Sequence, residues 1–361
     1  MFDMTKPTLT IKNGVKQFRS VGYNYNLNLT NGYHERWGVT TKDEDDPLNS
    51  PFGPEIADIE ISSGAGCPMS CAFCYKGNQK GNTAQNMSLE TFKQIFQKFP
   101  KFNGLFFIQQ VALGITSVAN MPDFFPICDY LRTNGIVSNV TINGADPITE
   151  TELKKLVSTM GAMAISINQN NYESGLTLIE RLTIAGAKQV NVHYVVSKQS
   201  VDFAYTLCDA TKTDSRLKKL NAIVFLSLKP KERGQSLDIL SSEGFQKLIR
   251  YCLDNEIRFG ADSCSAHKVI KSFTEKEHEL YDSVIEPCEA SSFSFYFNVD
   301  GKHYPCSFIE NENRDIWKTG IDLLSVKDFL TEVWSNPSII KFRNDVAESN
   351  KVGNNCCHFS V

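Results

Sequence analysis

The chain has 361 residues, of which 41% are hydrophobic and 22% are charged, and its formal net charge is −4. This length allows one large α/β domain with additions, or two domains, and the composition excludes fibrous and intrinsically disordered proteins. The slightly acidic balance gives no overall attraction for polyanions, so we expect neither an anionic membrane nor long nucleic acid as a partner.

The start of the chain, MFDMTKPTLT, lacks the apolar region of a secretory signal. Residues 102–122 carry no charge, but Gln109, Gln110 and Asn120 interrupt them, which indicates a buried strand with its loop rather than a membrane span. We therefore expect a cytoplasmic protein. Its eleven cysteines are an odd number, which favours metal or redox chemistry over a disulfide framework.

Residues 1–54 are polar and rich in turn formers. Within them, NLNLTNGYHERWG alternates about the pair Asn31-Gly32, which is the short-range signal of a β-hairpin. We predict an N-terminal extension with a β-hairpin.

From Ile56 onward, short apolar or β-branched runs alternate with segments of helical period. Such alternation predicts right-handed βαβ units and a parallel sheet, either as a partial barrel or as an open doubly wound sheet. Gly135, Gly161 and Gly186 stand where glycines close helices. The predicted strands are 56–62, 104–113, 138–144, 162–168, 188–196 and 221–228, with a seventh at 256–262. The predicted helices are 88–99, 124–135, 148–161, 174–186, 200–212 and 244–255.

After residue 262 this rhythm ends. The segment SSFSFYFNVDGKHYPCSF alternates about Asp300-Gly301, which predicts a second hairpin, and residues 326–336 predict a short amphipathic helix. We therefore divide the chain into the extension at 1–54, a core domain at 55–262 and a small C-terminal α+β module at 263–361.

The segment CPMSCAFC places Cys67, Cys71 and Cys74 directly after the first predicted core strand. Closely spaced thiolates converge on a soft metal with little loss of chain entropy. A structural zinc site uses four ligands, and this segment offers three. Three cysteines on a four-iron cubane leave one iron open to a reactant, so three ligands suffice for a catalytic cluster.

These spacings, with Phe73 before the last cysteine, resemble the CxxxCxΦC signature of the radical SAM superfamily. The resemblance implies a partial (β/α)6 TIM barrel and a [4Fe–4S] cluster whose open iron binds S-adenosylmethionine (SAM). One electron, from a reductant such as flavodoxin or ferredoxin, cleaves SAM to methionine and a 5′-deoxyadenosyl radical. That radical abstracts hydrogen from the substrate, in a reducing cytoplasm under low oxygen.

The resemblance also suggests residues for the SAM site. Phe73 is expected to pack near the adenine. The family's GGE-like motif corresponds to ALGITS here, which keeps a glycine but has no acid. Polar residues also stand at the carboxyl ends of later predicted strands, where barrel active sites form. They either contact the ribose or carboxylate of SAM or are ordinary hydrogen-bonded groups at strand ends. The candidates are Phe73, Gly114, Thr116, Asn143, Ser166 and Asn168.

A second group of cysteines flanks the C-terminal hairpin. Cys288, Gly301 and Cys306 resemble the C-x(9–15)-G-x4-C opening of SPASM and twitch extensions, which hold auxiliary iron–sulfur clusters. The rest of that pattern is absent, so the resemblance suggests completion by Cys356 or Cys357, with Cys264 as a further candidate. The alternatives are a small zinc site with these ligands, and Cys264 as a free catalytic thiol.

Other reactive residues have simpler interpretations. We expect His193 to lie in the core or to line the barrel rather than to act as a base. Lys229 and Arg233, in LKPKERG, could meet an anionic substrate group or lie in a solvated loop. Small buried hydrophobic roles are expected for Cys128, Cys208 and Cys252.

The resemblance thus implies a radical SAM enzyme whose substrate is a peptide or protein being modified or matured, or else a nucleotide, a cofactor or a small molecule. In such an enzyme the N-terminal hairpin either recognises a leader peptide or caps the barrel. The alternative is a non-catalytic zinc or iron–sulfur binding interaction protein on a degenerate barrel.

Overall fold

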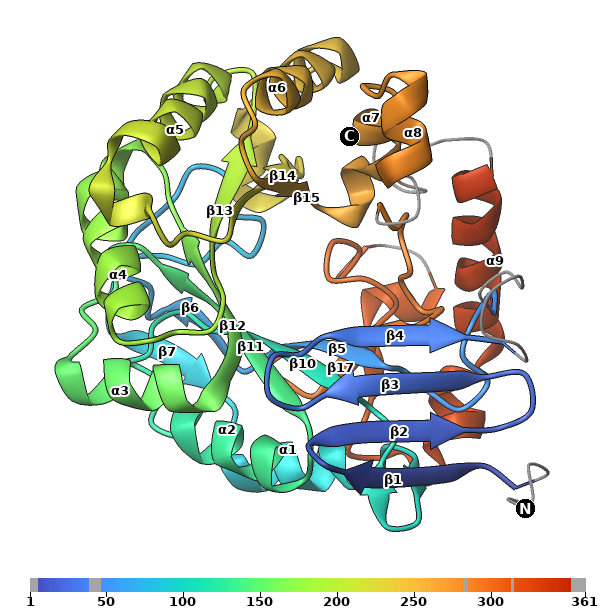
Figure 1. Ribbon diagram of the computed structural model, residues 1–361. Coiled ribbons are helices and arrows are strands. Elements are labelled where there is room, and N and C mark those ends of the chain that lie inside the picture. The colour runs from blue at the N-terminus through green and yellow to red at the C-terminus, as the bar shows by residue number, and fades with distance from the viewer. Residues whose placement is uncertain (1–5, 39–46, 282–284, 313–314, 352–361) are drawn as a thin grey trace.

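The computed structural model describes residues 6–38, 47–281, 285–312 and 315–351 (Figure 1). It has the predicted mixed α/β fold, in which eight neighbouring parallel strands dominate a sheet of ten. The strands stand in the order β15 (Phe259–Ala261), β14 (Ala222–Ser227), β13 (Val190–Val196), β12 (Met160–Ser166), β11 (Val137–Asn143), β10 (Gln110–Gly114), β5 (Ile56–Glu60), β16 (Ser294–Phe297), β17 (Lys302–Tyr304) and β18 (Ile321–Asp322).

Helices lie along the outer side of this curved sheet (Figure 1). Local sequence explains where several begin: the Ser88 hydroxyl caps the first helix, and Thr149 with Glu152 forms a capping box at the third. These helices are α1 (Leu89–Phe96), α2 (Phe124–Thr133), α3 (Glu150–Thr159), α4 (Tyr172–Ile184), α5 (Val201–Thr213) and α6 (Ser242–Asp254).

Alternation along the parallel strands separates two faces of the sheet. In β5, Ala57 and Ile59 are buried in the main core, which they share with Phe92 of α1. Asp58, between them, faces the opposite, inner side and is exposed. The apolar core therefore lies between sheet and helices, and the inner face carries polar side chains.

Gly161 does not close a helix, contrary to the prediction. α3 passes directly into β12, and Gly161 lies in that strand, where a Cβ would be 2.3 Å from Cγ1 of Val137. Glycine is required there for the close approach of β11. Gly135 and Gly186 do adopt left-handed backbone conformations, with φ of 67° and 91°.

Two predicted elements differ from the observed ones. The run at 104–113 is interrupted, because residues 107–109 separate a short strand from β10. The segment at 326–336 forms a five-residue π-helix over Leu330–Trp334 instead of an α-helix. The short strands near the interrupted run are β8 (Lys101–Phe102) and β9 (Leu105–Phe106).

The N-terminal region forms a four-stranded antiparallel sheet, whose last two strands pair on either side of the Asn31-Gly32 turn. It packs against segments that precede the core strands: Lys16 Nζ donates to the Ile108 carbonyl at 2.6 Å, and the Tyr25 hydroxyl donates to the Phe107 carbonyl at 2.6 Å. It therefore lies at the amino ends of the parallel strands. Its strands are β1 (Thr8–Lys12), β2 (Val15–Arg19), β3 (Asn24–Asn28) and β4 (His34–Trp37).

Lys16 gives a first testable prediction. Burial lowers the pKa of this amine to about 7, so between about pH 7 and pH 10.5 the unfolded chain binds more protons than the folded chain. Stability therefore rises with pH across this window, with Lys16 contributing about 1.4 kcal/mol per pH unit. In urea unfolding at a series of pH values, Lys16→Met should flatten this rise, and Lys12→Met, at an exposed lysine, should not. Equal slopes in all three proteins would contradict the assignment.

The C-terminal segment is joined to the main sheet. β16 pairs in parallel with β5 and antiparallel with β17, so the hairpin around Asp300-Gly301 extends the sheet beyond its first core strand. None of the described helices is long and apolar enough to cross a membrane. The remaining helices are α7 (Ala266–Ile270), α8 (Glu275–Tyr281) and α9 (Pro337–Lys351).

Candidate cluster and cofactor site at the cysteine loop

The three-cysteine segment lies at the tip of a small antiparallel hairpin that follows β5, formed by β6 (Ser62–Ala65) and β7 (Thr83–Asn86). The Cys67 amide donates to the Gln79 carbonyl at 3.1 Å, and the Gly81 amide donates to the Cys67 carbonyl at 3.2 Å. These bonds close the loop on itself, and because the loop follows β5 it lies at the carboxyl edge of the parallel sheet, where sites form in α/β proteins.

The three thiols are half-buried and influence one another electrostatically. Burial raises the pKa of Cys67, and it raises the pKa of Cys71 to about 11, with further increases from neighbouring thiolates. Three thiolates in this place therefore need a positive centre between them. The described residues contain no group of three His, Cys, Asp or Glu side chains arranged for a single metal ion. The soft donor set itself suits iron–sulfur ligation.

Two predicted site residues lie against Cys71. Asn168, after β12, directs its Nδ2 to the Cys71 sulfur at 3.6 Å, and the Asn143 side chain, at the end of β11, hydrogen-bonds the same cysteine. The Ser166 carbonyl is occupied by Asn171 Nδ2 at 2.9 Å. Neighbouring strand ends thus meet at the cysteine loop, as parallel topology requires.

The other residues predicted to contact SAM differ in how far they are exposed. Phe73 is half-buried within the loop, and Gly114 is exposed at the carboxyl end of β10. Thr116 is only 3% exposed, and its hydroxyl lies 2.6 Å from that of Ser62. A Cβ on Gly66 would be 2.9 Å from the Thr116 hydroxyl, so this threonine packs beneath the cysteine loop.

Asp146 is a residue that the sequence analysis missed. It follows β11 and accepts hydrogen bonds from the Ser117 hydroxyl at 2.5 Å and the Val118 amide at 2.9 Å. Burial raises its pKa, and its charge acts on Cys67. The ALGITS loop has no acid of its own, and this carboxylate reaches it from the next strand. The polar run NGAD after the strand indicated a residue of interest, but the sequence did not indicate that Asp146 binds Ser117 and Val118.

Lys229 and Arg233 are engaged within the protein. Lys229 Nζ lies 2.9 Å from the Asp262 carboxylate. Arg233 Nε donates to the Cys71 carbonyl at 3.0 Å, and its Nη2 donates to the Asn78 carbonyl. The interpretation of this segment as a solvated loop is wrong: Arg233 braces the cysteine loop from the segment that follows β14.

A buried charge network, which we call the Lys76 network, joins this loop to the C-terminal segment. Lys76 Nζ lies 3.0 Å from Glu60 and contacts Glu310, whose carboxylate also accepts from Tyr296 at 2.8 Å and Asn298 at 2.6 Å. Burial raises the pKa of Glu60. Burial also acts to raise that of Glu310, but its several donors leave it lowered. We assign the firmly ionised state to Glu310 because it has more donors.

The second group of cysteines gathers in the C-terminal segment. Cys288 and Cys306 both pack against a small cluster that includes Ile309 and Val346. The Cys288 carbonyl accepts from Asn350 Nδ2, near the end of α9, at 3.0 Å. Cys264 is 8% exposed in a 3₁₀ turn after β15. Two further predicted ligands, Cys356 and Cys357, lie outside the described residues.

The remaining cysteines are buried as predicted. Cys208 and Cys252 bring their sulfurs within 3.7 Å of each other between α5 and α6, and Cys128 is buried in α2. His193 lies on the inner face of β13, with its Nδ1 3.2 Å from the Thr141 hydroxyl, and burial lowers its pKa to about 4.

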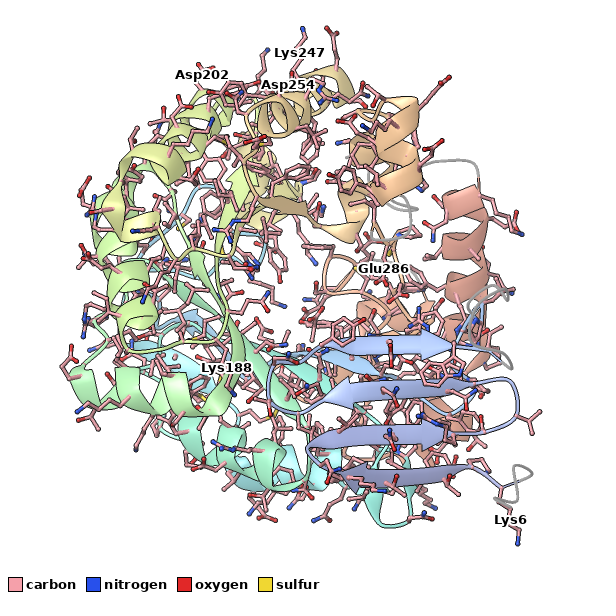
Figure 2. The ribbon with its side chains drawn as sticks, in the orientation of Figure 1. Lys6, Lys188, Asp202, Lys247, Asp254 and Glu286 are labelled. Carbon is pink, nitrogen blue, oxygen red and sulfur yellow. The ribbon has the colours of Figure 1, made fainter. Side chains whose placement is uncertain are left out.

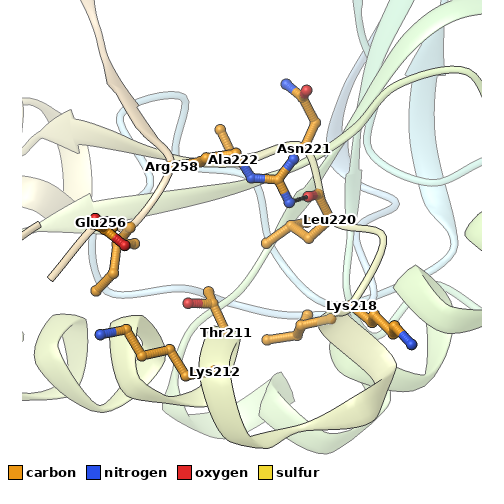
Figure 3. Close-up of a pocket in the computed structure, with 10 residues that line it drawn as sticks. Thr211, Lys212, Lys218, Leu220, Asn221, Ala222, Glu256 and Arg258 are labelled. Carbon is orange, nitrogen blue, oxygen red and sulfur yellow. Dashed lines mark hydrogen bonds between the residues drawn. The ribbon is translucent and has the colours of Figure 1, made fainter.

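A separate pocket of about 210 Å³ opens at the other end of the sheet (Figure 3). It is lined by Lys212, Ala222 and Arg258, and the Arg258 guanidinium donates to the Leu220 carbonyl. Ala222 begins β14, so this pocket lies at the amino ends of the strands, away from the cysteine loop. We assign it no part in the site.

Fold and site together define an α/β protein with a three-thiol loop at the carboxyl edge of its parallel strands. No family model matches the chain, and no curated protein matches it. Solved structures do match. SuiB from Streptococcus suis, bound to the precursor peptide SuiA, has a TM-score of 0.67 and 13% identity over 93% of this chain and 90% of its own.

SuiB bound to S-adenosylmethionine matches with a TM-score of 0.66 and 13% identity, over 92% of this chain and 90% of that one. Coproporphyrinogen III oxidase (HemN) from Escherichia coli, described as a radical SAM enzyme, matches 57% of this chain and 54% of its own at 14% identity and a TM-score of 0.41. The two SuiB matches, over nine-tenths of both chains, show that this chain has the fold of SuiB, and they confirm the predicted resemblance as a resemblance in fold.

Proposed function

We propose that this protein is a radical SAM enzyme that modifies a peptide. One observation carries the proposal: the three thiols of CPMSCAFC occupy the carboxyl edge of a sheet whose fold is that of SuiB, a protein solved with S-adenosylmethionine. Because SuiB was also solved with a precursor peptide, a peptide is the substrate class we favour.

In this proposal Cys67, Cys71 and Cys74 hold a [4Fe–4S] cluster. When bound, the cluster supplies the electron that cleaves SAM to methionine and a 5′-deoxyadenosyl radical, which takes a hydrogen atom from the substrate. The chain's own residues place these groups. Arg233 fixes the backbone at Cys71 and Asp146 fixes the loop after β10, which keeps the site preorganised.

Several side chains remain as candidates for contact with SAM. Phe73 and Gly114 lie at the loop and at the exposed strand end beside it, and Asn143 and Asn168 lie at Cys71. The Thr116 hydroxyl and the Ser166 carbonyl are instead engaged within the protein, by Ser62 and by Asn171.

We further propose that residues 55–262 form a partial (β/α)6 barrel whose inner face receives the substrate. The N-terminal hairpin belongs to a sheet at the amino ends of the strands, opposite the cysteine loop. That placement favours a capping role over direct presentation of a leader peptide to the site.

The C-terminal module, 263–361, is proposed to hold an auxiliary iron–sulfur cluster. Cys288 and Cys306 share one apolar cluster beside the end of α9, and Cys356 and Cys357 follow that helix in the sequence. Cys264 is a further candidate, as a ligand or as a catalytic thiol. The expected setting is a reducing cytoplasm with a flavodoxin- or ferredoxin-type reductant.

Anaerobic reconstitution tests this function directly. The full chain with iron, sulfide and SAM should bind about four irons at the first site, show broad visible absorption, and release 5′-deoxyadenosine on reduction with dithionite. Iron analysis measures the bound iron, and chromatography measures the released 5′-deoxyadenosine. A colourless protein that binds zinc and releases no 5′-deoxyadenosine would instead support the non-catalytic alternative.

A further inference from the structure

The inner face of the sheet is open where large apolar side chains would fill a packed barrel. Asp58 lies in the middle of β5 and Thr141 in the middle of β11, both strands have neighbours on each side, and yet both side chains are exposed. Ala112, the β10 partner of Asp58, is small. A solvent-accessible space therefore lies against the inner face at Asp58.

Asp58 lies on the inner face between two neighbouring strands, and its carboxylate, which is exposed to this space, is paired with no cation among the described residues. Burial raises its pKa to about 6, and no neighbouring group opposes this. Across the described ranges, its carboxylate makes no hydrogen bond or ion pair. Glu60, two residues further on the same face, contrasts with it, because Lys76 lies 3.0 Å away. β5 therefore presents one neutralised and one uncompensated carboxylate.

The position of Asp58 links it to the cysteine loop. Burial raises the pKa of Tyr75, the residue after Cys74, and the charges of Glu60 and Asp58 raise it further. On the other side of β5, Tyr296 of β16 is the register partner of Asp58. The Asp58 carboxylate is therefore close enough to the cysteine loop to act electrostatically on Tyr75.

An unpaired carboxylate with protein on several sides is less favourable than one in bulk water until a cation meets it, and a charged partner there interacts more strongly than in water. We infer that Asp58 binds a cationic group of the substrate, an ammonium or guanidinium such as a lysine or arginine side chain of a peptide. The inference rests on the proposed function only for the statement that the occupant is the substrate. Thr141 and His193, on the same face, supply hydrogen-bonding groups for its polar parts.

The test uses small peptide-like probes and calorimetry on the full, anaerobically reconstituted chain. Nα-acetyl-lysine amide and Nα-acetyl-arginine amide carry the cation, and Nα-acetyl-norleucine amide is the neutral control. Asp58→Asn should weaken binding of the cationic probes at least tenfold and leave the neutral probe unaffected. Asp202→Asn, on the outer helix α5 (Figure 2), should bind all three like the wild type. Equal binding of the cationic probes by wild type and Asp58→Asn overturns the inference.

Thermal unfolding provides a second readout. The pKa of Asp58 is raised in the folded protein, so its ionisation destabilises the fold, and this effect is complete above about pH 6. The effect becomes smaller as the pH falls from 6 toward 3.8, the ordinary pKa of an aspartate. The titratable groups around it, Glu60, Tyr75 and Tyr296, remain in the variant. Asp58→Asn should therefore unfold at a higher temperature than the wild type at pH 8, with a smaller difference at pH 5. A lower unfolding temperature at pH 8 marks Asp58 as structural and overturns the inference.

These readouts separate the two proposals. Release of 5′-deoxyadenosine by the wild type reports on the proposed function, whereas probe binding and unfolding report on Asp58 alone. A wild type that binds the cationic probes without cleaving SAM would retain the cation site and lose the enzyme assignment.

Discussion

A Cys71→Ala chain is expected to fold, to lose the iron of its first site and to release essentially no 5′-deoxyadenosine. Cys71 is half-buried in the loop and contributes to none of the apolar clusters, so its removal leaves the core intact. A three-thiol site has no spare ligand, and even partners outside the ligand sphere typically change metal affinity or activity by about 10–100-fold. We therefore expect a loss of more than about 100-fold in 5′-deoxyadenosine formation, measured by chromatography after reconstitution.

Cys306→Ala is the matched control for this experiment. Its sulfur lies in the C-terminal segment, so this variant should keep SAM cleavage at least in part and lose only the iron of the proposed auxiliary cluster. Wild-type iron content and wild-type 5′-deoxyadenosine release from Cys71→Ala would contradict the ligand assignment. An unchanged iron content in Cys306→Ala would contradict the auxiliary cluster and leave the first site unaffected.

Lys76→Met is expected to destabilise the protein by about 3–5 kcal/mol near neutral pH, because it leaves two buried carboxylates without their cation. The side chains of Lys76, Glu60 and Glu310 are 12%, 8% and 9% exposed. Methionine retains most of the volume of lysine, so the effect reports charge rather than packing. The loss should diminish in acid, where Glu60, whose pKa is raised by burial, becomes protonated and no longer needs the cation. Urea unfolding at pH 7.5 and pH 5 measures it.

Lys80→Met is the control, since Lys80 lies on the same loop with an exposed side chain. It should change the free energy of unfolding by less than about 0.5 kcal/mol. If both variants lose the same small amount, the Lys76 network is not a stabilising element, and the link between cysteine loop and C-terminal segment must depend on other contacts.

That link has a further component. Lys231, after β14, donates to the carbonyls of Phe308 at 3.2 Å and Glu310 at 2.7 Å. The C-terminal segment therefore contacts both the loop after β14 and, through Lys76, the loop after the first core strand. Because β5 and β14 lie far apart in the strand order, this segment bridges across the inner side of the sheet.

The sequence by itself determined the features that depend on local periodicity. Alternation of strand and helix patterns predicted the parallel core, because burial of one face repeats every two residues in a strand and about every 3.6 in a helix. The spacing of Cys67, Cys71 and Cys74 indicated soft-metal chemistry because ligands on one short loop can meet without a partner from a distant part of the chain. The turns at Asn31-Gly32 and Asp300-Gly301 were likewise readable, because turn residues act locally.

Only the tertiary structure decided the partners of the charged groups. Lys76 and Glu310 are separated by 234 positions, and Arg233 and Cys71 by 162. No local pattern connects such residues, because their contact depends on strand order and on which loops meet at one edge of the sheet. The same reason applies to Gly161, whose need for a missing Cβ comes from Val137 on the neighbouring strand. It applies to Asp58 as well: its residue type was visible in the sequence, but the lack of a counter-charge for it among the described residues is a property of the assembled inner face.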